Sequence, residues 1–214
     1  MEKIGLIYQP CGLGDILFLQ KVAYHIKDLG YEVYWPVVHE LAWLNDYIPD
    51  FNFVSWGDTE TKLTGPPLPD SVKFPFKEQY LQEKQTEITD ELYYFQGFIP
   101  GDPIMAGKYN QIDLDWSDWR DYVRFNRNKE KENSLFYDVL GLKDEDEYVF
   151  VNRTFATRPH LMFYEPISNS PDHYNCNVVE MSIVPGYSLF DWFKVFAQAK
   201  KIHMIEIILI LFRK

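Results

Sequence analysis

The spacing of apolar residues changes period near the start of the chain. A short apolar run covers Lys3–Gln9, and a glycine-containing turn, Pro10–Gly14, follows it. Along Ile16–Leu29 the apolar residues recur at three- and four-residue steps, the pattern of an amphipathic helix that ends at Gly30. A second apolar run covers Tyr31–Val38. Strand, glycine turn, helix and strand in this order predict a βαβ unit with a right-handed crossover.

The pattern weakens between this unit and residue 147. The stretch Gly65–Pro69 contains three prolines and is expected to be a loop, because proline cannot donate a ladder hydrogen bond or sit inside a helix. Short strands are expected at Phe51–Val54 and Leu92–Phe95. Helices are expected at four places: His39–Tyr47, Ile104–Tyr109, Asp118–Arg127 and Glu130–Leu140.

A second alternation of strand and helix follows the charged segment Lys143–Glu147. This segment is the best candidate for a domain boundary, giving domains 1–143 and 144–214, although an ordinary exposed loop explains it equally well. After it the pattern predicts, in order, a strand at Tyr148–Asn152, a strand at Val178–Val184, a helix from Ser188 to Lys201 and a strand from Ile202 to Leu211. Ser188 can cap its helix, with Asp191 completing a variant capping box.

Composition limits the class of protein. The 214 residues are 46% hydrophobic and 17% aromatic, which is enough to form a sizeable core and excludes a disordered chain. The formal net charge of -11 repels phosphate backbones, so general nucleic-acid binding is not expected.

Cysteines and the ends of the chain indicate a cytoplasmic protein. Cys11 and Cys176 are too few for a disulfide framework, so a reducing compartment is expected. The N-terminus does not have the pattern of a signal peptide. The longest apolar run, Ile207–Phe212, is far shorter than the ~20 residues that a bilayer span needs.

The turn Gly12-Leu13-Gly14-Asp15 is the most informative motif. Glycines between a strand and a helix let the backbone turn sharply and let a ligand approach the main chain. The motif lacks the third glycine of the dinucleotide fingerprint and has Asp15 instead. A carboxylate there would repel a phosphate but could accept the proton of a sugar hydroxyl, or it could do no more than cap the helix.

Several segments together carry a resemblance to a known family. They are Gly12–Leu17, Gly30–Val37, Ile48–Asp50, Gly186–Trp192 and Ala199–His203. In this order the sequence resembles the GT-B glycosyltransferases, in particular the heptosyltransferase-like group (glycosyltransferase family 9-like). The resemblance touches both ends of the chain and adds little between residues 60 and 140.

The resemblance implies an α/β protein of two Rossmann-like domains, with the acceptor bound by the first and a nucleotide sugar by the second. It implies an inverting and metal-independent transfer of a hexose or heptose, in which Asp15 is the catalytic base. The nucleotide sugar is a co-substrate, and no further cofactor is expected. A glycan, a lipid-linked sugar or a glycoprotein would be the acceptor.

Further site residues follow from this reading. On the acceptor side they are Gly12, Gly14 and Lys108, although a solvated surface lysine is the more common case. On the nucleotide-sugar side they are Asn152, Arg153, Ser188 and Glu206, since ligands of doubly wound sheets bind beyond the carboxyl ends of the strands. Asp113-Leu114-Asp115 has the form of a metal motif but is expected by chance in an acidic chain.

The end of the chain departs from the family pattern. Such proteins continue after Ile202–Glu206 with a small turn and a helix, whereas this chain has the apolar run and ends at Lys214. A second nucleotide-binding domain usually needs ~100 residues, so the second domain is expected to be incomplete. We expect either a truncated or frameshifted product, which the abrupt end of the resemblance favours, or a natural short form.

Three functions therefore stay open. The first is a glycosyltransferase-like enzyme, either active or inactivated by truncation. The second is a non-catalytic module of the same fold that binds a nucleotide or sugar. The third is a structural protein in which the glycine turn is only a turn.

Overall fold

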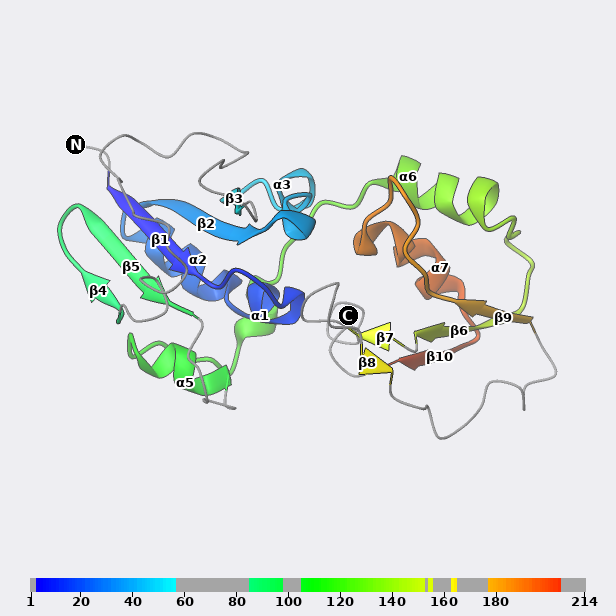
Figure 1. Cartoon of the computed structure of the whole chain (residues 1–214). Helices are drawn as coiled ribbons and strands as arrows, with labels where there is room; N and C mark the ends of the chain where they lie inside the picture. The colour runs from blue at the N-terminus through cyan, green and yellow to red at the C-terminus, as the bar shows by residue number, and fades with distance from the viewer. Residues whose placement is uncertain are drawn as a thin grey trace. The chain divides into compact units, whose positions relative to one another are not determined.

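The computed structural model of the chain describes residues 3–56, 85–97, 105–152, 154–155, 163–164 and 177–204. They form mixed α/β structure with parallel sheets, as the alternating pattern predicts (Figure 1). The chain divides into two units, residues 1–125 and 126–214, each with its own sheet.

The first unit is built on a five-stranded sheet with the order β3-β2-β1-β5-β4. Strands β1, β2, β3 and β5 are parallel, whereas β4 is an antiparallel edge strand. The parallel pairing of β1 with β2 confirms the expected βαβ unit. The strand bounds are β1 Ile4–Tyr8, β2 Glu32–Val38, β3 Asn52–Trp56, β4 Glu87–Ile88 and β5 Leu92–Gln96.

Two short helices, α1 (Leu13–Phe18) and α2 (Gln20–Asp28), stand where one helix is expected. The hydrogen bonding nevertheless continues through Leu19, whose N–H donates to the Asp15 carbonyl at 2.9 Å and whose carbonyl accepts from Ala23 at 3.0 Å. The remaining helical segments are η1 His39–Leu41, α3 Leu44–Tyr47, α5 Met105–Asn110 and η2 Trp119–Tyr122.

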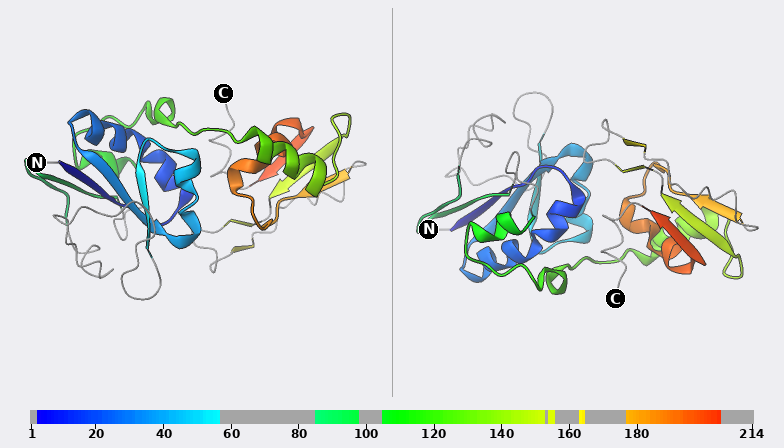
Figure 2. Two further views of the ribbon diagram at one scale, coloured as in Figure 1. Left: turned by 90° about the horizontal axis from the view of Figure 1, so that it is seen from above. Right: turned by 90° about the horizontal axis from the view of Figure 1, so that it is seen from below.

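Helix α2 packs against β1 and β2 through its apolar stripe (Figure 2). At Gly5 of β1 a side chain would meet this helix, since a Cβ there would lie 2.4 Å from Cγ2 of Ile26. Glycine at this position therefore allows the helix to lie close to the central strand.

The expectation of a helix at Asp118–Arg127 is wrong beyond Tyr122. Val123 has extended backbone, with ψ 108°, and the N–H of Arg124 donates to Oε1 of Gln20 at 2.9 Å. A buried side-chain acceptor thus takes the place of the backbone carbonyl that a helix would supply.

The second unit has a parallel three-stranded sheet with the order β10-β6-β9. A separate antiparallel pair consists of β7 and β8. The strand bounds are β6 Tyr148–Asn152, β7 Thr154–Phe155, β8 Phe163–Tyr164, β9 Asn177–Glu180 and β10 Lys201–Met204. Strand β9 ends before the expected Val184, and the end of the last expected strand lies outside the described residues.

One aromatic-rich cluster forms the core of this unit. Helix α6 (Lys129–Asn133) continues into the π-helix η3 (Ser134–Val139), and η5 (Leu189–Trp192) continues into α7 (Phe193–Gln198). These helices and the sheet contribute Leu135, Phe136, Tyr148, Phe150, Trp192, Val195 and Phe196. Because η3 packs into this core, the division between the units falls after Phe125, earlier than the charged link at Lys143–Glu147.

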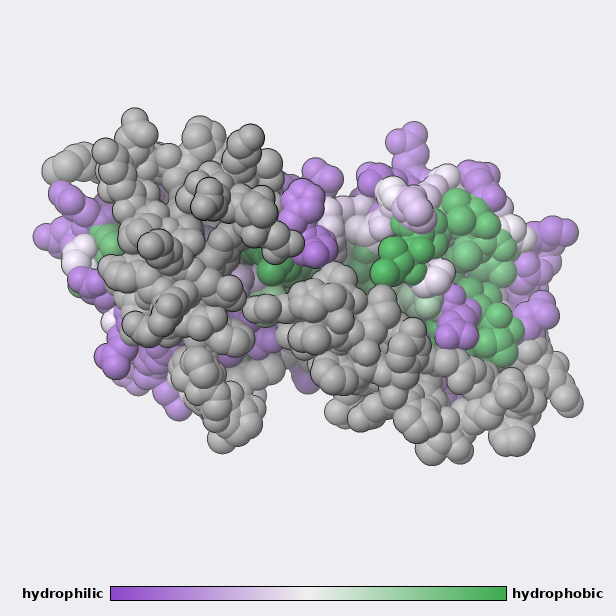
Figure 3. Space-filling model, viewed as in Figure 1, coloured by the Kyte–Doolittle hydropathy of each residue, from purple (hydrophilic) through white to green (hydrophobic). Residues whose placement is uncertain are grey.

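Apolar side chains also reach the surface of the second unit. Figure 3 shows them gathered over β9 and the segment that follows it. They include Val178, 41% exposed, and Ile183, 76% exposed. Among the helices in the described ranges, none has the length and apolar character needed to cross a bilayer.

The buried carboxylate of Glu132 forms an ion pair at the start of the second unit. Glu132 is 1% exposed and accepts two hydrogen bonds from Arg127, the first from Nε at 2.7 Å and the second from a terminal nitrogen. The guanidinium of Arg127 also lies 3.6 Å from the ring centroid of Phe193 in α7. This one cation therefore connects the chain before α6 with α6 and α7.

We expect Arg127→Met to lower the free energy of unfolding by about 3 kcal/mol, because it leaves the Glu132 carboxylate buried without its main partner. Urea unfolding measures the loss. Arg120→Met is the matched control, because Arg120 is exposed and contacts only the Trp119 ring at 5.7 Å among the interactions described. Equal losses in the two variants would contradict the role of the buried pair.

Tyr148 makes the second unit sensitive to alkaline pH. Burial, and to a lesser extent Asp146, raises the pKa of the Tyr148 phenol above its usual value. The hydroxyl donates to the Val195 carbonyl, and only the neutral form can do so. A raised folded-state pKa stabilises the native chain below the unfolded value of about 10, and this contribution is lost as the pH rises beyond it.

We therefore expect the stability difference between the wild type and Tyr148→Phe to narrow above about pH 10. Near neutral pH the variant should lose about 1 kcal/mol with the hydrogen bond. Urea unfolding at neutral and alkaline pH measures both values. A difference that stays constant across this range would show that Tyr148 does not couple folding to pH.

Candidate functional site

The carboxyl ends of the parallel strands of the first unit meet at one edge of the sheet. Tyr8 of β1 lies opposite Gln96 of β5, and the N–H of Gly97 donates to the Tyr8 carbonyl at 2.9 Å. From β1 the chain crosses to β2 on one side, while β5 lies on the other side. The strand order therefore reverses between the neighbouring strands β1 and β5. In open α/β sheets, ligands bind beyond the carboxyl ends of the strands at such a point.

The glycine turn connects β1 to α1 at this edge. Gly12 is the residue before the helix and has φ 82°, a backbone conformation that favours glycine. The carbonyl of Pro10 accepts the N–H of Val38 at 2.8 Å, which ties the turn to the end of β2. A Cβ at Gly12 would lie 2.5 Å from Oδ2 of Asp15, so the carboxylate lies directly over this glycine.

Asp15 is paired with a buried lysine from a distant part of the sequence. Nζ of Lys108 in α5 lies 2.6 Å from Oδ1 of Asp15. The Lys108 residue is 8% exposed, whereas 33% of the Asp15 side chain is exposed. The same ammonium donates to Oε1 of Gln9 at 2.8 Å, so two oxygen atoms compensate for its burial.

Two hydrogen bonds hold α5 beside this edge. The buried hydroxyl of Tyr109 donates to the Phe18 carbonyl at the end of α1, and burial raises the pKa of this phenol. Nε2 of Gln111 donates to the Gln96 carbonyl at the end of β5 at 3.0 Å. The helix that carries the lysine is thus connected both to the helix that carries Asp15 and to the neighbouring strand.

The structure brings together the suggested base, Asp15, and the three residues that the sequence suggests for the acceptor side. Gly12, Asp15 and Lys108 lie at the same edge, and Gly14 lies in the first turn of α1 beside Asp15. Sequence reasoning missed Gln9, although its position directly after the central strand was a usable signal. Lys108 is buried against protein oxygens, not solvated as a surface lysine would be.

The residues suggested for the nucleotide-sugar side are less closely grouped. Asn152 is buried at the end of β6. Ser188 precedes η5, and both its N–H and its hydroxyl donate to Oδ2 of Asp191, at 2.7 and 3.0 Å. This confirms that Ser188 caps the helix with Asp191. Arg153 and Glu206 lie outside the described residues.

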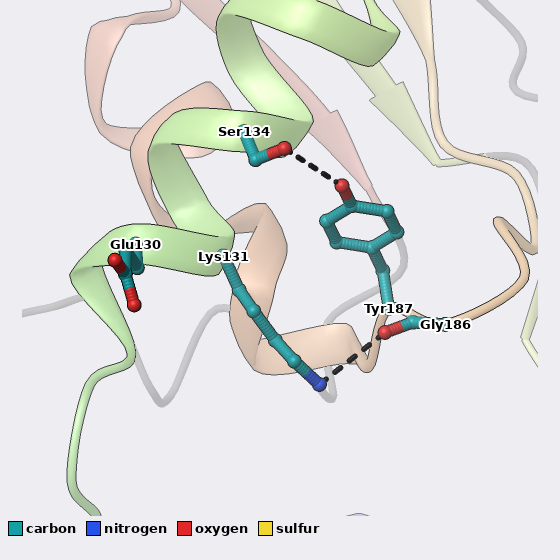
Figure 4. Close-up of a pocket in the computed structure, with 5 residues that line it drawn as sticks. All are labelled: Glu130, Lys131, Ser134, Gly186 and Tyr187. Carbon is teal, nitrogen blue, oxygen red and sulfur yellow. Dashed lines mark hydrogen bonds between the residues drawn. The ribbon is translucent and has the colours of Figure 1, made fainter.

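A hollow of about 420 Å³ lies in the second unit between α6 and the turn before η5 (Figure 4). Its polar groups bond to one another: Ser134 and Tyr187 share a hydrogen bond of 3.0 Å, and Lys131 donates to the Gly186 carbonyl at 3.3 Å. These contacts fasten the turn to the helix. The hollow has no charged group held in place by buried partners, so the Asp15 edge is the stronger candidate.

The Asp113–Asp115 motif is explained by local structure. Asp115 accepts the Ser117 hydroxyl at 2.6 Å and the Ser117 N–H at 3.0 Å. These hydrogen bonds hold the pKa of the Asp115 carboxyl below its usual value. Within the described ranges no three His, Cys, Asp or Glu residues come together as metal ligands would.

Comparison with known proteins yields little. No family model matches the sequence, and no curated protein matches it. A solved structure that resembles the chain is a glycosyl transferase family 9 protein from Veillonella parvula DSM 2008, at 12% identity and a TM-score of 0.42. The match covers 74% of this chain and 55% of that one, so the chain spans about half the length of that protein.

We expect Gly12→Ala to destabilise the chain more than Gly30→Ala. Both positions have positive φ, 82° and 88°, so each substitution strains the backbone by about 1–2 kcal/mol. At Gly30 a Cβ would meet nothing within 4 Å, whereas at Gly12 it would collide with Asp15. The difference between the two losses in free energy of unfolding, measured with urea, gives the cost of the collision with Asp15. Equal losses would show that the carboxylate is free to move away.

Proposed function

We propose that the chain is a glycosyltransferase-like protein in which Asp15 accepts the proton of an acceptor hydroxyl. The observation that carries this proposal is the place of the carboxylate. It lies partly exposed where the strand order reverses, with one oxygen held by a buried ammonium. The resemblance of the Gly12–Asp15 turn to the heptosyltransferase-like group supports the same role.

The reaction step is a displacement at the anomeric carbon of a nucleotide sugar. The acceptor oxygen forms a bond to that carbon while its proton passes to Asp15. The bond from the anomeric carbon to the diphosphate oxygen breaks, and the nucleoside diphosphate leaves with the electron pair. Attack from the side opposite the leaving group inverts the anomeric centre, and the step requires no metal ion.

Different parts of the chain are assigned to the two substrates in this proposal. Gly12 leaves room beside the main chain for the Asp15 carboxylate, and Gly12 and Gly14 are proposed to lie against the acceptor. On the donor side, Asn152 follows the central strand of the second sheet and Ser188 begins the next helix. Together with Arg153 and Glu206 these residues are proposed to bind the nucleotide sugar, in a GT-B arrangement of two Rossmann-like domains.

The acceptor is proposed to be a glycan, a lipid-linked sugar or a glycoprotein, and the location cytoplasmic. A hydroxyl of such an acceptor is uncharged, which suits a chain whose net charge is -11. The proposal includes no cofactor other than the nucleotide sugar itself.

Binding of a sugar or nucleotide without turnover is the second candidate. It is favoured by the ion pair itself, because a carboxylate already bonded to Lys108 can orient a hydroxyl through hydrogen bonds without removing its proton. The two candidates differ in their products. Only transfer releases a nucleoside diphosphate.

The test is the release of nucleoside diphosphate from UDP-, GDP- and ADP-linked hexoses and heptoses, with water as the acceptor when no other is present. Asp15→Asn keeps the size of the side chain and an oxygen that can accept from Lys108. We expect it to lower the rate by about 100- to 10,000-fold, as loss of a general base does.

Asp28→Asn is the matched control, because Asp28 is an exposed aspartate on α2 of the same unit. It should retain the wild-type rate. Full activity of Asp15→Asn would refute the role of Asp15 as base. Calorimetric binding of a nucleoside diphosphate, with no release from any donor by the wild type, would favour the binding module.

A further inference from the structure

The buried amide of Gln9 has a defined orientation. Gln9 is 2% exposed, and its Nε2 donates to the Cys11 carbonyl at 2.6 Å while its Oε1 accepts from Lys108 at 2.8 Å. If the amide were turned over, its NH₂ would face an ammonium and its oxygen would face a carbonyl. Both contacts would then be repulsive, so only one orientation of the amide is favourable.

The orientation of Gln9 determines where the ammonium of Lys108 lies. An ammonium with so little exposure needs oxygen partners, and the described structure provides two, Gln9 Oε1 and Asp15 Oδ1. The main chain of Gln9 is itself fixed, because its carbonyl accepts Nε1 of the buried Trp35 at 3.2 Å. A chain of hydrogen bonds thus runs from the core of the sheet through Gln9 and Lys108 to Asp15.

The two oxygens of Asp15 consequently differ. Oδ1 is held by Lys108, whereas among the described residues Oδ2 accepts no hydrogen bond and lies over Gly12. We propose that Gln9 and Lys108 are positioning residues that hold the Asp15 carboxylate in a single rotamer, with Oδ2 as the atom that takes the hydroxyl proton. This inference rests on the proposed function for the role of Oδ2, but not for the fixed rotamer.

A second buried lysine offers a matched control. Lys21 is 6% exposed and is bonded to Asp118 and to the Asp115 carbonyl. It lies in the same unit as Asp15, and its described contacts do not include that residue. Removing its ammonium should cost stability as the loss of Lys108 does. It should leave the rotamer of Asp15 unchanged, so the two lysines separate a positioning effect from a general loss of stability.

The experiment measures the χ1 rotamer of Asp15 from three-bond NMR couplings of its Cγ to the backbone nitrogen and carbonyl carbon. We expect single-rotamer couplings in the wild type and in Lys21→Met, and averaged couplings in Lys108→Met and in Gln9→Leu. Averaged couplings in the wild type, or a single rotamer in both Lys108→Met and Gln9→Leu, would overturn the proposal. The wild-type measurement decides even where a variant does not fold.

A kinetic arm tests the consequence for transfer, using the nucleotide sugar from which the wild type releases diphosphate. We expect Lys108→Met and Gln9→Leu to lower kcat by up to about 100-fold, with a much smaller effect on KM, because a misplaced base affects the transition state more than binding. If these variants show averaged couplings but an unchanged kcat, Oδ2 of Asp15 is not the atom that accepts the proton. If the wild type acts on no donor, the proposed function fails while the NMR result still decides whether Asp15 is positioned.

Discussion

Complete burial of the central strand is the constraint on which the first unit depends. All five residues of β1 are buried, and the strand is hydrogen-bonded on both sides to parallel neighbours. Its side chains therefore cannot take part in binding, and polar chemistry can begin only where the strand ends. Gln9, the first residue after β1, is still buried and must bond to the protein through both ends of its amide. Strand β6 of the second unit is equally buried, and Asn152 at its end is also a buried polar residue. The same constraint thus places an amide side chain at the carboxyl end of each central strand.

The local patterns in the sequence were sufficient to predict most strands and the glycine turn. Hydrophobic periodicity and the residue preferences of turns are set by a few neighbouring residues. The strands predicted at Lys3–Gln9 and Tyr148–Asn152 therefore correspond closely to β1 and β6. The failure at Asp118–Arg127 has a non-local cause. Arg124 is drawn out of helical geometry by Gln20, a residue on another helix, and no periodicity within the segment carries that information. The division of the chain into two units falls before η3 for a similar reason, because η3 packs against residues much later in the chain.

The residues of the candidate site also separate into those that a local motif identifies and those that depend on tertiary packing. Asp15 and Gly12 could be identified from their place in a strand–turn–helix motif. That Lys108 lies against Asp15 depends on α5 packing beside α1 through Tyr109 and Phe18, whose rings lie 4.8 Å apart. Lys108 and Asp15 are far apart in the sequence, so the sequence could suggest Lys108 as an acceptor-side residue but not its contact with Asp15. The place of Gln9 directly after the central strand could be identified from the sequence, but its contacts with Lys108 and the Cys11 carbonyl could not.

Cations are in the minority in this chain, with 21 Lys and Arg against 32 Asp and Glu, and several of them connect distant segments. Lys21 connects α2 to the segment around Asp118, and Arg127, which is paired with Glu132, also lies over the ring of Phe193 in α7. The Lys108–Asp15 pair lies at the β1–β5 edge, where the strand order reverses, and, as in the Lys21–Asp118 pair, its cation is buried while its carboxylate is partly exposed. A buried cation cannot readily meet a substrate, so any contribution of Lys108 to binding or transfer must act through Asp15. In the proposed function the buried lysine therefore positions the carboxylate, and the partly exposed aspartate meets the acceptor hydroxyl.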